Sequence, residues 1–299
     1  MSVKRKALIG AGVWLLGAIA IGILFGSHGK NNSFQPQNEF KLDAWIPVKI
    51  GGIDFSITKA VMYVLLATLL TCATMVFVAR RMQQRPNKVQ TAIEFLFGLM
   101  RDNITRGNMD DAMARRWFPL IGALFLFILF SNLIGFIPLP TNTEHEIAVF
   151  GTHIPSFSLY AATANLSIPL VLALIVFISY TGEGIRAKGP IGYMKSLVPA
   201  GITGAAAVPL FLLELMSNMM RLVSLSVRLF ANILAGHLMI LFFAGALAVI
   251  LGVAAIAWVT MPLAILIFLF EVVLVAGLQA FIFATLTAVY LGSAVAEQH

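Results

Sequence analysis

Long apolar runs alternate with short basic clusters along the chain. Four runs, at residues 7–26, 58–79, 117–138 and 159–180, have the length of about 20 residues that a helix needs to cross a hydrocarbon core. Their apolar residues are continuous rather than alternating, which favours helices over the strands of a membrane barrel. The pattern therefore predicts an all-α integral membrane protein with about four vertical transmembrane helices.

The last third of the chain departs from this pattern. From about residue 197 to residue 291 it is almost entirely apolar, with little polar interruption. Hydropathy alone would divide this region into three or four vertical spans. The same region is equally compatible with long tilted helices joined by a tight turn.

Three further segments are predicted to lie outside the membrane core. Residues 89–106 carry apolar side chains at helical spacing, with charged residues between them, which predicts an amphipathic helix on the membrane surface. The polar residues 31–57 and the stretch "PLPTNTEHEIAVFGTHIP" after the third run are predicted to be external loops.

Basic residues flank the runs on alternating sides, which orients the chain. Clusters at 4–6, 80–81, 115–116 and 186–188 place these points in the cytoplasm by the positive-inside rule. Residues 1–30 form an N-terminal hydrophobic segment that begins like a signal peptide. Its length and the lack of a small-x-small cleavage site favour a retained helix, although a cleaved signal stays possible.

Composition excludes several classes of function. The chain is 60% hydrophobic and 11% charged, and its net charge of +7 resides in the flanking clusters, so no nucleic-acid partner is expected. The single cysteine, Cys72, allows no intrachain disulfide and is expected to be a small core residue. No Walker A motif and no H-x-x-x-H pair occur, so neither nucleotide chemistry nor a bound metal or cofactor is expected.

Five ionisable residues interrupt the apolar last third. Each costs about 2.5–3.5 kcal/mol at the centre of a membrane helix, so a group of them indicates function. They are Glu214, Arg221, Arg228, His237 and Glu271, with Asn218, Asn232 and Gln279 as uncharged polar neighbours.

The spacing of these residues predicts a polar stripe along one helix. Glu214, Arg221 and Arg228 are seven residues apart, so they fall on nearly one line, with Ser217 and Ser224 beside it. Glu214 can approach Arg221 but is too far along the helix to reach Arg228. An arginine side chain stays protonated in proteins, so the counter-charge of Arg228 must come from a neighbouring helix or from another protein.

Three motifs give the chain a family resemblance. They are "SLSVRLFANILAGH" at 224–237, "LQAFIFATLTAVYL" at 278–291 and, more weakly, "FSNLIGFIP" at 130–138. With these motifs the chain resembles the a subunit of the F-type ATP synthase over roughly residues 58–292. The resemblance implies a proton-channel domain at 58–299, in which a long tilted helical hairpin at about 190–292 lies against a ring of c subunits.

The resemblance also implies partners and roles. The partners are the c-subunit ring, the b subunits of the peripheral stalk, the remaining F1Fo complex and the lipid bilayer of a bacterial inner membrane. Arg228 would face the rotor carboxylate, Asn232, His237 and Gln279 would line one aqueous half-channel, and Glu214, Ser217 and Ser224 would line the other. The subunit would translocate protons without being an enzyme itself.

Two positions depart from the family pattern. An acidic or histidine group is expected seven residues before Gln279, where Val272 stands, whereas Glu271 is eight residues before it. Either a local helix irregularity, for which Gly277 offers freedom, restores Glu271 as a companion of the proton relay His237, or Glu271 has a different role. In "TANLS" at 163–167, Asn165 replaces an expected aspartate, which weakens a proton role for the fourth run.

Two other classes of protein remain as alternatives. A proton- or sodium-coupled secondary transporter could use Arg228 to bind an anionic substrate, but such folds contain internal repeats, and no repeat is found here. An intramembrane hydrolase built on His237 and Glu271 lacks the usual third ligand or a nucleophile motif. The coupling ion, H⁺ or Na⁺, stays open.

Overall fold

The computed structural model describes residues 3–25, 38, 40–42, 44–50, 53–81, 88–198 and 207–296. Within these residues five helical segments are long and apolar enough to cross a membrane. They are Lys59–Val78, Asp111–Ile134, Ser167–Lys188, Ala207–Leu251 and Ala255–Val295. The prediction of an all-α integral membrane protein is confirmed.

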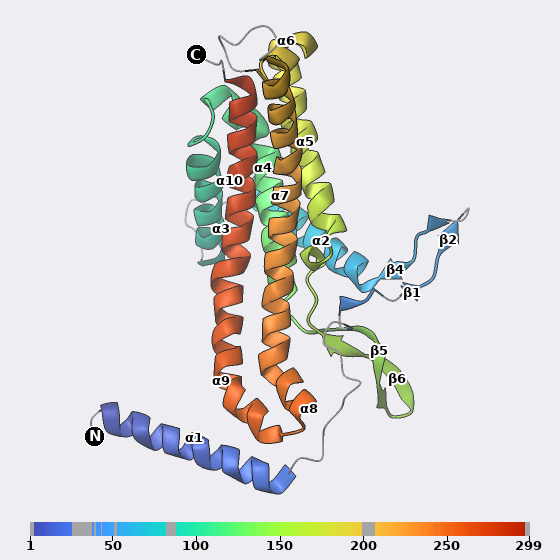
Figure 1. Cartoon of the computed structure of the whole chain (residues 1–299), viewed down its shortest axis with the longest axis vertical. Coiled ribbons are helices and arrows are strands. Elements are labelled where there is room, and N and C mark those ends of the chain that lie inside the picture. The colour runs from blue at the N-terminus through green and yellow to red at the C-terminus, as the bar shows by residue number, and fades with distance from the viewer. Residues whose placement is uncertain are drawn as a thin grey trace.

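The apolar last third forms a hairpin of two long helical rods (Figure 1). The first rod consists of α7 (Ala207–Leu241), the π-helical turn η5 (Phe242–Ala246) and α8 (Leu247–Leu251). The second consists of α9 (Ala254–Phe270), the π-helical turn η6 (Glu271–Val275) and α10 (Ala276–Val295). Gly252, in the left-handed conformation at φ 72°, ends the first rod, as glycine commonly does. Two long helices joined by a tight turn, rather than three or four spans, are therefore observed.

A bundle of shorter helices packs against one part of the hairpin. It comprises α2 (Lys59–Arg81), α4 (Asp111–Ile134) and α5 (Ser167–Lys188), with α4 against α10 and α5 against both α7 and α10. Along α10 every fourth residue is a fully buried alanine: Ala276, Ala280, Ala284 and Ala288. Small residues at this spacing let helix backbones approach closely inside a membrane, where packing replaces the hydrophobic driving force.

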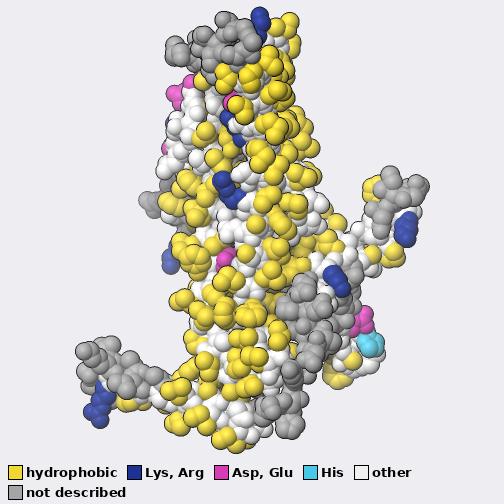
Figure 2. Space-filling view, viewed as in Figure 1, with side chains coloured by type: hydrophobic (Ala, Val, Ile, Leu, Met, Phe, Trp, Pro, Cys, Tyr) yellow, Lys and Arg dark blue, Asp and Glu magenta, His cyan; other side chains and the backbone are white. Residues whose placement is uncertain are grey.

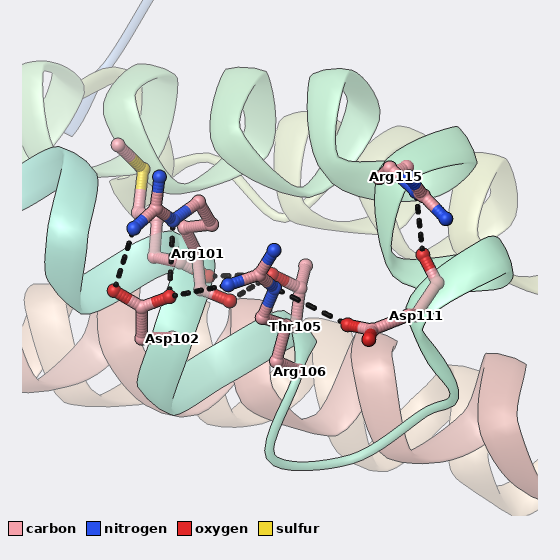
Figure 3. Close-up of polar contacts among 7 residues, drawn as sticks. Arg101, Asp102, Thr105, Arg106, Asp111 and Arg115 are labelled. Carbon is pink, nitrogen blue, oxygen red and sulfur yellow. Dashed lines mark hydrogen bonds and ion pairs between the residues drawn. The ribbon is translucent and has the colours of Figure 1, made fainter.

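The predicted amphipathic segment forms α3 (Lys88–Gly98) and the π-helical η2 (Leu99–Thr105). It is not among the helices that could span a membrane, and its buried residues Met100 and Ile104 join the core around α4. The turn that follows is held by ion pairs of Asp102 and Asp111 with Arg101 and Arg106 (Figure 3). A hydrogen bond from Arg101 holds the pKa of the Asp102 carboxyl below its ordinary value.

Short strands occupy both segments that were predicted to be loops. Strand β1 (Ala44–Ile46) pairs with β4 (Ile57–Thr58), β2 (Lys49–Ile50) with β3 (Ile53–Asp54), and β5 (Leu139–Val149) with β6 (Thr152–Ser158). Positive φ angles at Phe150 (51°) and Gly151 (81°) form the tight β5–β6 turn, because a two-residue hairpin favours this twist.

Three predicted features of the sequence are placed differently. The fourth run begins as α5 only at Ser167, because Asn165 has an extended backbone and its side chain accepts the Ser167 N–H at 3.0 Å. The third run begins earlier than predicted, at Asp111, and ends at Ile134. Cys72, predicted to be a core residue, is exposed on α2, so that prediction was wrong.

The N-terminal run forms α1 (Val3–Phe25), which crosses the α8–α9 end of the hairpin (Figure 1). The rings of Trp14 and Trp258 stack with centroids 4.5 Å apart, and the Trp258 indole N–H donates to the Trp14 carbonyl at 3.2 Å. Gly17 leaves the space that the Trp258 ring fills. These contacts join α1 to α9.

We expect a disulfide to form between cysteines placed at Gly22 and Ala255, with Cys72→Ser removing the natural thiol. A Cβ at Gly22 would lie 3.5 Å from the Ala255 Cβ, within the range of disulfides. The measurement is the mass and electrophoretic mobility of the purified protein after oxidation. Ile23→Cys with Ala255→Cys is the matched control and should stay reduced, because Ile23 is 79% exposed. A mature chain that begins after α1 would contradict the expectation.

Candidate functional site

A polar stripe runs along the outer face of α7. It consists of Glu214, Ser217, Arg221, Ser224 and Arg228, which one uninterrupted helix carries, as their spacing predicted. Ser217, Ser224 and Arg228 are exposed, and the other two residues are partly buried. The exposed neighbours of the stripe are apolar: Met216, Met220, Val223 and Val227. Figure 2 shows that the whole visible face is likewise largely hydrophobic, with few charged side chains.

Arg228 makes no hydrogen bond and no ion pair with any residue that the structure describes. The acidic residue of its own stripe is already engaged, because Glu214 accepts from Arg221 at 3.5 Å. The sequence predicted both the Glu214–Arg221 approach and the lack of a local anion for Arg228. A guanidinium on an apolar face therefore points outward, where a second chain could supply the counter-charge.

A first cavity, of about 170 Å³, lies on one side of Arg228 and is called here the Arg221 cavity. Residues of α5, α7 and α10 line it, among them Tyr180, Lys188, Glu214, Asn218, Arg221 and Tyr290. The Arg221 guanidinium lies over the Tyr290 ring, 5.3 Å from its centroid, and the buried Tyr180 hydroxyl has no hydrogen-bond partner among the described residues. Such a polar and sufficiently large space can hold water.

A second cavity, of about 320 Å³, is called here the His237 cavity. It lies between α7 and the β5–β6 region, and its lining includes Pro138, Phe157, Ser158, Leu159 and His237. Lys188, of the Arg221 cavity, belongs to a basic cluster predicted to be cytoplasmic, whereas the β5–β6 strands form a segment predicted to be external. The two cavities are therefore expected to open toward opposite sides of the membrane.

Arg228 lies between the two cavities along α7. Arg221 is seven residues before it and His237 nine residues after it, which are separations of about 10 Å and about 14 Å at 1.5 Å per residue. His237 also faces another side of the helix, as predicted, because it is buried whereas Arg228 is exposed.

His237 is held by two backbone carbonyls. Its Nδ1 lies 3.0 Å from the Ile233 oxygen and its Nε2 lies 3.1 Å from the Gly135 oxygen, while the ring stacks on Phe136 at 4.8 Å. A neutral imidazole can donate to only one of these oxygens, whereas the protonated ring can donate to both. The geometry thus suits a side chain that gains and loses a proton.

Glu271 is buried and lies against Gly236, the residue that precedes His237 in the sequence. A Cβ at Gly236 would overlap with the Glu271 carboxyl group, and Oε2 of this carboxyl has no hydrogen-bond partner among the described residues. The predicted helix irregularity is the turn η6, in which the Ala276 N–H bonds to the Glu271 carbonyl five residues back. It ends before Gly277 rather than at it. No hydrogen bond joins Glu271 to His237 in the described part of the chain.

The remaining predicted residues are spread over the hairpin. Gln279 is buried on α10 and Asn232 is partly buried on α7, and neither lines the two cavities; the same holds for Ser217 and Ser224. Asn218 lines the Arg221 cavity but was not among the predicted site residues, although its place four residues after Glu214 is a usable helical signal. Within the described residues no group of three or more His, Cys, Asp or Glu could hold a metal ion.

We expect Gly236→Ala to destabilise the protein, because the added methyl group must displace the Glu271 carboxyl. Overpacking of a filled site costs about 1–3 kcal/mol. The melting temperature of the purified protein in detergent measures the effect. Gly245→Ala, farther along the same rod, is the matched control and should not lower the melting temperature, since nothing lies within 4 Å of its Cβ position. Equal melting temperatures for the two variants would contradict this packing.

Comparison with known proteins assigns the chain to a family. Residues 61–292 match the sequence model of the family described as ATP synthase A chain. The ATP synthase subunit a of Hyphomonas neptunium is 32% identical over 274 residues, covering 89% of this chain and 98% of the relative. That of Rubrobacter xylanophilus is 34% identical over 252 residues, covering 83% and 88%.

The match includes the polar stripe, Glu271 and most of the residues that line the two cavities, and it starts after α1. It does not favour the alternative of a secondary transporter that acts alone. The chain is a multi-pass membrane protein and belongs to the ATP synthase A chain family.

Proposed function

We propose that this chain is the proton-translocating stator subunit of an F-type ATP synthase, and that Arg228 is the fixed charge facing a carboxylate on the c-subunit ring. The observation that carries the proposal is the outward guanidinium, without a partner among the described residues, between two cavities. The apolar residues around it form a surface suited to a lipid-embedded rotor.

The mechanism follows from the cost of charge in lipid. A protonated, neutral rotor carboxyl can move through the hydrocarbon core, whereas an ionised one is strongly disfavoured there. Beside Arg228 the ionised form is favoured, because an opposite charge lies within a few ångströms. A proton must therefore leave the rotor before the arginine is reached and another must bind after it is passed. Each charge that crosses the whole membrane contributes about 2.3 kcal/mol per 100 mV.

The two cavities supply the separate routes that this mechanism needs. The His237 cavity would serve the external side, with His237 as the proton relay and Glu271, Asn232 and Gln279 as polar groups near it. The Arg221 cavity would serve the cytoplasmic side, with Glu214 in its wall and Ser217 and Ser224 on the stripe toward Arg228. The fixed charge of Arg228 repels a proton that would pass directly from one route to the other.

The remaining assignments concern partners and chain organisation. We assign residues 58–299 to the channel domain, residues 31–57 to the external side and residues 1–30 to a retained N-terminal hydrophobic segment. The b subunits of a peripheral stalk and the rest of the F1Fo complex would complete the machine, and those partner chains would perform the nucleotide chemistry.

We expect Arg228→Ala to abolish ATP-driven proton pumping by the reconstituted complex, while ATP hydrolysis by the soluble sector survives. Without Arg228 the ionised rotor carboxyl loses its stabilisation, and a loss of more than about 1.4 kcal/mol already changes its ionisation equilibrium tenfold. Pumping should therefore fall below about one tenth of its normal level. The measurement is quenching of a pH-sensitive dye in vesicles, beside phosphate release.

Arg186→Ala is the matched control, since this arginine is exposed at the cytoplasmic end of α5, and it should pump normally. Normal pumping by Arg228→Ala would refute the proposal. Solute flux through the isolated chain in liposomes would instead indicate a transporter.

We expect thiols in the two cavities to be reached from opposite sides of the membrane. In a Cys72→Ser background, a membrane-impermeant maleimide should label Asn218→Cys from the cytoplasmic side and Leu159→Cys from the external side. Leu229→Cys, at a core position that is 1% exposed, should remain unlabelled from either side. Labelling of both cavities from one side would rule out two separate half-channels.

A further inference from the structure

Asn132 is a fully buried amide that joins three segments, and the mechanism above makes no use of it. It lies on α4, its Oδ1 accepts the Thr163 hydroxyl at 2.8 Å, and its Nδ2 donates to the Ala276 carbonyl at 3.4 Å. Thr163 belongs to the 3₁₀ turn η3 (Ala162–Ala164), and Ala276 is the first residue of α10. Because Asn132 and Ala276 are both 0% exposed, bulk water cannot replace this hydrogen bond.

The Ala276 carbonyl lies where the π-helical turn η6 ends. The Ala276 N–H donates to the Glu271 carbonyl and closes this turn, which contains one residue more than a regular helical turn. Such wide turns are rare and short in helices, so their position needs support from surrounding groups. The Asn132 amide binds the backbone at this end point, and among the described residues it is the only side chain from another element with a hydrogen bond to η6 or to Ala276.

The position of the wide turn decides where Glu271 points. Each residue of a regular helix turns the chain by about 100°. If η6 lost its extra residue, Glu271 would rotate by about this angle relative to α10 and would point away from Gly236. The inward side of η6 is occupied by Glu271 and Val275, both buried, whereas Val273 is 69% and Leu274 is 54% exposed. A shifted turn would therefore place an apolar side chain against Gly236 and move the carboxyl toward the lipid-facing side.

We propose that Asn132 is a positioning residue that fixes η6 at Glu271–Val275 and thereby directs the Glu271 carboxyl to Gly236, beside His237. The consequence for proton transfer rests on the proposed function of that site. The asparagine amide offers a donor and an acceptor together, whereas leucine offers neither, so leucine removes both bonds at Asn132.

The test measures the direction of position 271 without using proton pumping. Gly236→Cys and Glu271→Cys are combined in a Cys72→Ser background, and disulfide formation is measured by mass in the assembled complex. The pair should cross-link, because the Glu271 side chain fills the space of a Gly236 Cβ. Adding Asn132→Leu should lower the cross-linking rate at least about tenfold, the effect of about 1.4 kcal/mol in an equilibrium between two turn positions.

Ser131→Ala is the matched control, since the neighbouring Ser131 hydroxyl is buried and has no hydrogen-bond partner among the described residues. It should cross-link as fast as the parent pair. Deletion of the exposed Val273 removes the extra residue of the turn, so in this background Asn132→Leu should no longer affect cross-linking. If Asn132→Leu does not assemble, Thr163→Val takes its place, because it removes only the hydroxyl that orients the amide.

Equal cross-linking with and without Asn132→Leu would overturn the inference, and so would a parent pair that does not cross-link or an equal loss in Ser131→Ala. The readout is independent of proton pumping. A failure of the proposed function would therefore appear in the Arg228→Ala experiment and leave the cross-linking result unchanged.

Discussion

A single positive charge that is not neutralised by the described chain constrains the whole structure. The guanidinium of Arg228 stays protonated and lies exposed among apolar side chains of α7, while Glu214 is engaged by Arg221. In lipid such a charge is costly unless an anion or water is near. Under the proposed function, a partner chain on the outer face of the hairpin would bring this negative charge and would lose it again by gaining a proton. The long uninterrupted helix α7 holds the arginine at a fixed distance from both cavities.

The packing of the hairpin against the shorter helices depends on small residues at the places where polar groups are buried. The alanines of α10 allow α4 to approach closely, and this approach brings Asn132 within reach of the Ala276 backbone. Gly236 leaves room for the Glu271 carboxyl, and the Gly135 carbonyl is near enough to contact His237. Larger side chains at these points would separate the helices and leave buried polar atoms without partners, which costs about 1–3 kcal/mol for each group. The close packing of the helices and the hydrogen bonds of their buried polar groups thus depend on the same small residues.

The sequence predicted the individual helices of the fold better than the contacts between them. Continuous apolar runs and a spacing of seven residues were sufficient for the all-α class and the polar stripe, because these depend on one helix at a time. Hydropathy left the hairpin open beside three or four vertical spans, and only the family resemblance implied it. The wide turn at Glu271 could be inferred only as some irregularity, since the offset of one residue from the family pattern does not show where the helix absorbs it. The late start of α5 depends on the Asn165 side chain, and the exposure of Cys72 depends on which face of α2 packs against α4. The cavities combine residues from α5, α7, α10 and the β5–β6 region, and no local signal connects Tyr180 to Tyr290.

The arrangement of His237 and Glu271 limits how protons can move at this end of the hairpin. Both ring nitrogens of His237 contact backbone carbonyls, and Glu271 contacts the glycine beside it rather than the ring. A proton therefore cannot pass between them through a direct hydrogen bond in this conformation. Either a water molecule enters between them from the His237 cavity, or one ring nitrogen releases its carbonyl and turns toward the carboxyl. Both routes would require Glu271 to stay directed inward, so under the proposed roles of these two residues the position of the turn η6 would matter to proton transfer at His237.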